Sequence, residues 1–267
     1  MGKIVHEPRP KSADSTDRGM VTGPFVTCES TKSYLVQGHT IHLRHHPNVF
    51  SPSAFGVQFA GRVTLNAGER VIDIGTGTGL LAILAAKNGA GEVVATDTCE
   101  TALEITRSNA HELNGVPHIE TRHGSFFCGA GGVFDAITAN LPQEIVPPAH
   151  LAELNETQAR AICGGGYGGN SVLLSFLEAA PDFMHEASRL YVIVNTITDY
   201  KSTIRAIEKS YRARVVWSGV ATTKPFVGAH IGWFREFIDN GVVDIFRDDD
   251  GHWLARQHIY ELRRSGS

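Results

Sequence analysis

Apolar residues recur with two different periods along the chain, and the two periods predict alternating strands and helices. Residues 70–75 and 92–97 are short apolar runs, the pattern of strands buried in a parallel sheet. Residues 80–90 and 99–115 instead repeat apolar positions at helical spacing, and a glycine stands at or near the end of each segment. A β-α-β-α order therefore begins at residue 70.

The same order continues toward the C-terminus. Further strands are predicted over 118–127, 134–142, 189–197 and 213–221, and further helices over 170–184 and 199–211. Asp249-Asp250-Gly251 lies between two alternating runs in residues 242–264, which predicts a terminal hairpin. We expect an α/β fold with a doubly wound, seven-stranded Rossmann-like sheet, mostly parallel with an antiparallel C-terminal strand.

An N-terminal extension precedes this pattern. It begins with a polar segment and continues with short predicted strands that turn at Gly38-His39. A loop and a helix follow, with Ser51 or Ser53 as the predicted N-cap. We expect residues 1–49 to form an extension and candidate lid, and residues 50–267 to form the main domain.

Composition narrows the class of protein. The chain is 42% hydrophobic and 19% charged with a formal net charge of −4, which disfavours nucleic acid as a partner. The cysteines and histidines lack metal-ligand spacing, so no metal is expected. No signal peptide and no apolar run near 18 residues is present, so we expect a cytoplasmic protein without a membrane partner. The sequence does not decide whether the protein forms a homodimer.

Three alternate glycines, Gly75, Gly77 and Gly79, stand where the first strand turns into its helix. Glycine lets the backbone approach a ligand closely and adopt positive φ. Asp97 ends the next strand and would lie beside this turn, where ribose hydroxyls could donate to its carboxylate. A dinucleotide and an adenosine-bearing sulfonium both fit this arrangement.

Asp73 discriminates between these two ligands. A carboxylate two residues before Gly75 would repel a pyrophosphate and attract a sulfonium or an ammonium group. The three glycines are spaced GxGxG. The dinucleotide motif GxGxxG has its third glycine one position later, where this chain has none. A nicotinamide-dependent oxidoreductase is therefore disfavoured.

With "VIDIGTGTGLLAILAA", "ATD" and "FDAITANLPQ", residues 50–262 resemble the class I S-adenosylmethionine-dependent methyltransferases. This resemblance implies S-adenosylmethionine as cofactor. It implies that the three glycines flank the methionine part, that Asp97 binds the ribose and that Asp73 places the ammonium group. The adenine would lie against Ser125 and Phe126. The remaining implied cofactor contacts are Phe50, Ser51, Thr76, Thr98 and Asn140.

The segment "ANLPQ", residues 139–143, resembles the Asn-Pro-Pro-Tyr motif of the release-factor glutamine methyltransferases, and "NVFSPSAFGVQFA" and "AICGGGYGGN" resemble other parts of that branch. Asn140 can accept a hydrogen bond from an attacking N–H, and the stiff backbone at Pro142 can add a carbonyl acceptor. Alignment of nitrogen and methyl group would then supply most of the catalysis. Gln143 replaces an aromatic residue, which disfavours a nucleobase acceptor. Tyr167 lies in a glycine-rich loop and is a candidate to contact the cationic cofactor.

The predicted function is methyl transfer to a nitrogen of a small molecule or a protein amide, with catalytic candidates Asn140, Pro142, Gln143 and Tyr167. One alternative resembles the azetidine-2-carboxylate synthases of natural product biosynthesis, in which the cofactor's own amine attacks its side chain and releases methylthioadenosine. A nucleic-acid adenine methyltransferase and a non-catalytic binding protein are weaker alternatives. The aromatic-rich residues 225–238 are an expected insertion over the substrate mouth or an oligomer contact.

Overall fold

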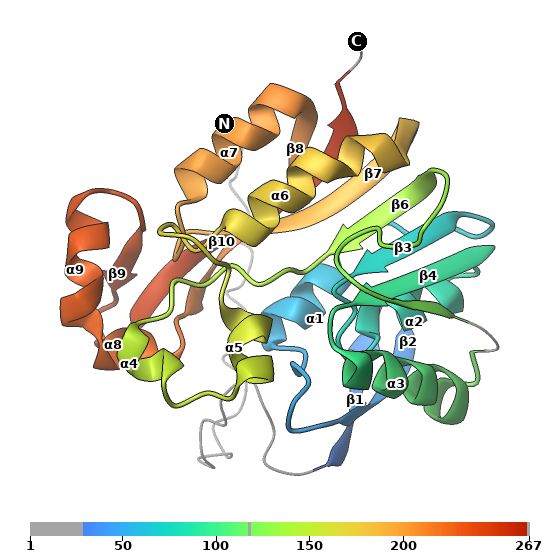
Figure 1. The fold of residues 1–267 in the computed structure, drawn as a ribbon, viewed down its shortest axis with the longest axis horizontal. Coiled ribbons are helices and arrows are strands. Elements are labelled where there is room, and N and C mark those ends of the chain that lie inside the picture. The colour runs from blue at the N-terminus through green and yellow to red at the C-terminus, as the bar shows by residue number, and fades with distance from the viewer. Residues whose placement is uncertain (1–28, 117–118, 266–267) are drawn as a thin grey trace, which may run out of the picture.

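The computed structural model describes residues 29–116 and 119–265, and its ribbon is drawn in Figure 1. The strands are β1 (Ser30–Val36), β2 (His39–His45), β3 (Arg70–Ile74), β4 (Glu92–Asp97), β5 (Glu120–His123), β6 (Phe134–Ala139), β7 (Met184–Asn195), β8 (Tyr211–Thr222), β9 (Ile245–Arg247) and β10 (Trp253–Arg264). The α-helices are α1 (Ala54–Ala60), α2 (Leu80–Lys87), α3 (Glu100–Ser108), α4 (Pro148–Leu151), α5 (Glu156–Ile162), α6 (Ser171–Ala179), α7 (Tyr200–Ser210), α8 (Pro225–Ala229) and α9 (Ile231–Asp239). A π-helical turn, η1 (Asn109–Leu113), follows α3, and a 3₁₀ turn, η2 (Ala180–Phe183), follows α6.

The main sheet confirms the predicted fold class. Its strand order is β5-β4-β3-β6-β7-β10-β8, with parallel pairing from β5 to β7 and β10 antiparallel to both of its neighbours. The short strand β9 pairs with β10 and adds an eighth member, so the predicted terminal hairpin is β9–β10. Strand order reverses at β3, which has β4 on one side and β6 on the other. The carboxyl ends of these three strands are where a doubly wound sheet binds its ligand.

Apolar side chains fill both faces of the sheet because consecutive residues of each strand point to opposite sides. On one face Val71 of β3 joins the core formed with α1, α2 and the β1–β2 hairpin. On the other face Ile72 joins the core formed with α6 and α7. Figure 1 shows these two groups of helices on opposite sides of the sheet.

The described part of the N-terminal extension is a two-stranded hairpin. Its turn has positive φ at Gln37 and Gly38, one residue before the predicted position. Ile41 and Leu43 are fully buried in the core with α2. The hairpin therefore packs beside α2. The predicted lid role of 1–49 stays a prediction because residues 1–28 lie outside the described range.

Several predicted boundaries changed for identifiable reasons. The helix over 99–115 is divided into α3 and η1, because Asn109 turns its side chain inward to bond Arg44 N at 2.8 Å and Thr78 O at 2.9 Å. The helix over 170–184 ends earlier, where Pro181 enters η2. The segment between β6 and α6, for which no helix was predicted, contains α4 and α5, and the expected insertion forms α8 and α9.

Ser53, one of the two predicted caps, is the N-cap of α1 and accepts a hydrogen bond from Gly56 N. None of the helices in the described part of the chain is both long enough and apolar enough to span a membrane.

Candidate active site

The glycine-rich turn after β3 is held open by backbone conformation. Gly75, Gly77 and Gly79 have φ values of 69°, 58° and 90°, in the left-handed region that favours glycine. A Cβ added at Gly75 would lie 3.1 Å from Leu141 Cδ2, and one at Gly77 would lie 3.5 Å from the carbonyl oxygen of Phe50. The turn therefore faces the start of the "NLPQ" segment and the chain before α1.

Asp97 lies at the carboxyl end of β4 and is fixed by backbone amides. Its Oδ2 accepts from Gly77 N at 2.9 Å, and its Oδ1 accepts from Cys99 N at 2.9 Å. Burial raises the pKa of Asp97, and these amides act in the opposite direction. The carboxylate is thus oriented against the glycine turn, with lone pairs left for further donors such as ribose hydroxyls.

Asp73 lies beneath the turn, with 1% of its surface exposed. The hydroxyls of Thr76 and Thr138 donate to its two oxygens, each at 2.8 Å. Burial raises the pKa of Asp73 to about 6, although both hydroxyls oppose that rise. The charge of Asp73 therefore acts on the site from beneath the turn. Its hydrogen bond also holds in place the side chain of Thr76, a predicted cofactor contact.

The predicted adenine contacts lie beside Asp97. Gly124 N donates to the carbonyl oxygen of Asp97 at 2.9 Å, and Cys128 N closes a turn on Ser125 O at 3.0 Å. Ser125 is exposed, and half-buried Phe126 has a positive φ of 51° while its ring lies 5.7 Å from that of Phe176. A strained non-glycine residue at this position is the kind of feature that functional sites contain.

Thr98 follows Asp97 and is exposed. Its carbonyl oxygen lies 3.1 Å from His123 Nε2, which connects the start of the β4–α3 segment to β5.

The "NLPQ" segment is clamped to the neighbouring strand. Gln143 is buried, with its Nε2 donating to Ile193 O at 3.2 Å and its Oε1 accepting from Asn195 N at 3.0 Å. Leu141, which is also buried, and Pro142 lie between this anchor and Asn140. Gln143 thus binds β7 with both ends of its amide. No sequence motif predicted this contact, and the predicted catalytic role of Gln143 stays a prediction.

Asn140 lies at the end of β6, and its side chain approaches the first turn of α1. Its Nδ2 lies 3.5 Å from the position that a Cβ of Gly56 would take. Together with the contact between Phe50 and Gly77, this places residues 50–56 along the site from the glycine turn to Asn140. The structure therefore brings the predicted cofactor contacts from three separate segments to one edge of the sheet.

Ser51, another predicted contact, belongs to a hydrogen-bonded chain that sequence reasoning missed. Its Oγ lies 2.6 Å from Nδ1 of the fully buried His45, whose Nε2 lies 3.0 Å from the Tyr34 hydroxyl. Burial lowers the pKa of His45, and the nearby charge of Lys32 lowers it further. A neutral histidine therefore links the β1–β2 hairpin to the wall of the site.

Tyr167, a candidate to contact the cofactor, packs against α9. It is 64% exposed, and its ring lies 4.9 Å from the ring of Phe237 on α9. Trp233 extends this aromatic surface, with its ring 4.9 Å from Phe237. Tyr167 thus joins the glycine-rich loop to the α8–α9 insertion, and its predicted contact with the cofactor stays a prediction.

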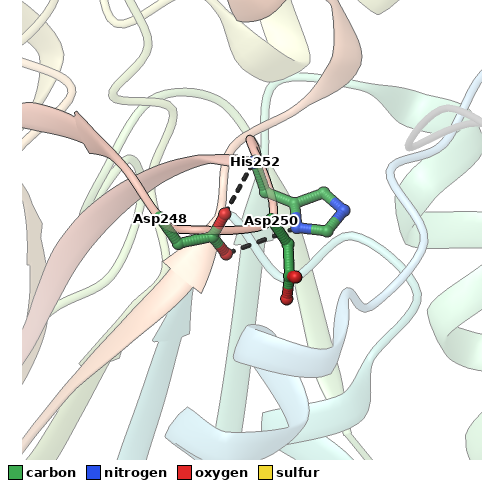
Figure 2. A group of neighbouring side chains, drawn as sticks. All are labelled: Asp248, Asp250 and His252. Atoms are coloured by element: carbon green, nitrogen blue, oxygen red, sulfur yellow. Dashed lines mark hydrogen bonds and ion pairs between the residues drawn. The ribbon is translucent and has the colours of Figure 1, made fainter.

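A group of possible metal ligands lies elsewhere, in the turn between β9 and β10. Figure 2 shows Asp248, Asp250 and His252, whose ligand atoms all lie within 4.8 Å of one another. Asp248 accepts from His252 N at 2.7 Å and lies 3.3 Å from its Nδ1. These contacts close the hairpin turn, so the group has a structural explanation and no metal is assigned to it.

Comparison with known proteins finds relatives among methyltransferases. Residues 57–180 match the family model "Ribosomal protein L11 methyltransferase (PrmA)". The chain is 26% identical over 174 residues to a Methanocaldococcus jannaschii protein whose name proposes a protein N5-glutamine methyltransferase, covering 65% of this chain and 86% of that one. It is 36% identical over 104 residues to the ribosomal protein L11 methyltransferase of Exiguobacterium, covering 39% of this chain and 32% of that one.

Among solved structures, the fold resembles the Thermus thermophilus 16S rRNA N2 G1207 methyltransferase in complex with AdoMet and guanosine. The TM-score is 0.55 at 15% identity, with 91% of this chain and 52% of that chain covered. The chain spans only about a third of the length of the Exiguobacterium methyltransferase. The open glycine turn and the oriented Asp97 carboxylate fit S-adenosylmethionine, which is the cofactor. The chain is therefore an S-adenosylmethionine-dependent transferase, and its residues 57–180 are similar to the methyltransferase domain of the PrmA family.

Proposed function

We propose that this enzyme transfers a methyl group from S-adenosylmethionine to the amide nitrogen of a glutamine side chain in a protein. The observation that carries the proposal is the position of Asn140, at the end of β6 beside the glycine turn, in a segment that Gln143 fixes to β7. A rigidly held hydrogen-bond acceptor at this place suits a reaction that depends on orienting an N–H group.

The chemistry follows from alignment. When bound, S-adenosylmethionine supplies an electrophilic methyl group. The side-chain oxygen of Asn140 accepts one amide N–H of the substrate, and a carbonyl of the Leu141-Pro142 backbone accepts the other. Both bonds lie in the amide plane, so they aim the nitrogen lone pair and increase its electron density. Formation of the N–CH₃ bond breaks the S–CH₃ bond and releases S-adenosylhomocysteine. The nitrogen then loses its proton to solvent, so the enzyme needs no strong base.

The comparisons support an amide in a protein as acceptor. The name of the M. jannaschii relative proposes protein glutamine methylation, and the family model is named for a ribosomal protein methyltransferase. The formal net charge of −4 gives no general attraction to a polyanionic acceptor. A protein acceptor is therefore favoured over nucleic acid.

The test uses purified enzyme, S-adenosylmethionine and a blocked tripeptide with a central glutamine. We expect S-adenosylhomocysteine and an N-methylated peptide, identified by mass spectrometry, with no product from the matched peptide that carries glutamate. A third reaction omits the acceptor. Methylthioadenosine in that reaction would support the cyclisation alternative and contradict methyl transfer as the function.

A further inference from the structure

An ion pair lies immediately after the "NLPQ" segment. Glu144 and Lys224 form it from segments 80 residues apart, the first following Gln143 and the second preceding α8. Lys224 Nζ also lies 5.3 Å from the centroid of the Phe50 ring, on the chain that contacts the glycine turn. The pair therefore borders the region where an acceptor must approach the cofactor.

The pair has hydrogen-bonding capacity left over. Within the described residues, Glu144 Oε2 is covered from solvent and has no hydrogen-bond partner. Lys224 Nζ is paired with Glu144 Oε1, and an ammonium group has three donors, so it can donate to a further acceptor. The two side chains are 17% and 27% exposed, so the pair lies close to the surface from which an acceptor would approach. Buried polar atoms without partners are rare in folded proteins, and a bound ligand is one way to satisfy them.

The backbone beneath the pair is fixed. Glu144 N donates to Ile162 O at 3.2 Å, and Gly164 N donates to Glu144 O at 3.1 Å. These bonds join the end of the "NLPQ" segment to the last residue of α5 and to the chain that follows it. Glu144 thus keeps a constant position relative to Asn140, as a specificity residue requires.

We propose that Glu144 and Lys224 form an acceptor subsite that binds a peptide group of the polypeptide next to the methylated side chain. Lys224 donates to the peptide carbonyl oxygen, and Glu144 accepts from the peptide N–H. This inference rests on the proposed function, because it assigns the part of the acceptor that lies outside Asn140.

Charge selects the peptide group over a free amino acid. A peptide group offers one acceptor and one donor without net charge, which matches the unfilled capacity of an intact ion pair. The ammonium and carboxylate of a free amino acid would each compete with the existing contact between Glu144 and Lys224. The subsite therefore favours glutamine within a chain.

The test compares wild type with the double variant Lys224→Met/Glu144→Met. Replacing both charges together avoids leaving one of them buried alone, so the variant is expected to fold. Lys201→Met is the matched control, because Lys201 also lies over an aromatic ring, that of Tyr200, at 5.8 Å. The probes are N-acetylglutamine N-methylamide, free glutamine and propionamide, which keeps only the side-chain amide.

Two quantities are measured for each probe: kcat and KM from S-adenosylhomocysteine release, and the Kd of the probe by calorimetry with S-adenosylhomocysteine bound. We expect the double variant to raise KM and Kd for the blocked glutamine by about tenfold or more, with kcat within about twofold. The double variant should leave KM and Kd for propionamide unchanged. The Lys201→Met control should leave KM and Kd unchanged for every probe.

Each contrary outcome is distinguishable. An unchanged KM and Kd for blocked glutamine, or an equal loss with propionamide, would overturn the subsite and leave the proposed function intact. Tighter binding of free glutamine than of blocked glutamine would overturn the peptide-group assignment. Binding that depends on the pair without any methyl transfer would support the subsite and overturn the proposed function. Neither binding nor turnover with any probe would overturn both.

Discussion

The proposed cofactor half of the site, around the turn after β3, and its proposed acceptor half, around Glu144, are built in different ways. In the cofactor half, the turn after β3 is held by close neighbours: Gly75 N and Thr76 N both donate to Thr96 O, at 2.9 and 3.0 Å, and Asp97 accepts from Gly77 N. In the acceptor half, Glu144, Tyr167 and Lys224 come from separate segments. Figure 1 shows α4, α8 and α9 gathered at one side of the molecule.

This difference indicates where specificity resides. In the cofactor half, hydrogen bonds between the β3 turn and the end of β4 hold the glycines and Asp97 in place above the buried Asp73, so this half suits one constant ligand. The acceptor half has exposed aromatic rings and an ion pair with unfilled capacity, so it can vary its substrate without disturbing the sheet. Variants in the two halves should therefore separate cofactor affinity from turnover and acceptor affinity.

Asn140→Ala should have the largest effect, on the acceptor side only. Loss of one aligned group in a preorganised site lowers kcat by about 10²–10³-fold in comparable cases. The affinity for S-adenosylmethionine, measured by calorimetry, should stay within about twofold. Asn155→Ala, at the exposed N-cap of α5, is the control and should keep kcat. A large loss of cofactor affinity would instead place Asn140 in the cofactor half.

Asp97→Ala should weaken the affinity for S-adenosylmethionine, the quantity that Asn140→Ala leaves unchanged. Removing a charged hydrogen-bond acceptor costs about 1.5–3 kcal/mol, which is roughly 10–150-fold in Kd for S-adenosylmethionine. Asp248→Ala removes a carboxylate in the β9–β10 turn and should leave that Kd unchanged. Equal affinities for the two variants would show that the ribose binds elsewhere.

Gly77→Ala tests the open turn itself, with Gly115→Ala as a control for backbone strain. Both glycines have positive φ, 58° and 62°, so each alanine should lower the free energy of unfolding by about 1–2 kcal/mol. A Cβ at Gly115 meets nothing within 4 Å, whereas one at Gly77 projects into the site. We expect about a tenfold weaker Kd for S-adenosylmethionine in Gly77→Ala alone. Similar affinities in both variants would contradict a close approach at Gly77.

Asp73 predicts a pH dependence. Its pKa of about 6 in the folded state lies above the unfolded value, so ionising it costs stability, and its contribution to the free energy of unfolding falls as pH rises from about 4 to 6. The cationic cofactor favours the ionised carboxylate. Its Kd should therefore weaken by up to about tenfold from pH 7.5 to pH 5, as measured by calorimetry. Asp73→Asn should remove most of this change, and an unaltered pH profile in that variant would assign it to another group.

Most of the sheet and the position of the glycine turn beside Asp97 could be predicted from the sequence because their signals are local. Strand and helix periods, the glycines and Asp97 all lie within a short stretch around β3 and β4. The anchor between Gln143 and β7, the chain from Ser51 to His45 and the pairing of Glu144 with Lys224 join residues distant in sequence or without a recognisable motif. No period or spacing encodes such contacts, so only the folded chain reveals them.

Substitutions of Tyr167 should have the smallest effects on kcat and KM. Its ring packs on Phe237, and 64% of the residue is exposed, so its contribution should come from the ring more than from the hydroxyl. Tyr167→Phe should keep kcat and KM for the blocked glutamine peptide within about twofold, while Tyr167→Ala should raise KM by a few fold because the glycine-rich loop loses its contact with α9. Kd for S-adenosylmethionine should stay constant in both. A loss of cofactor affinity in Tyr167→Phe would mean that the hydroxyl reaches the sulfonium site, and the boundary between the two halves would then run through this loop.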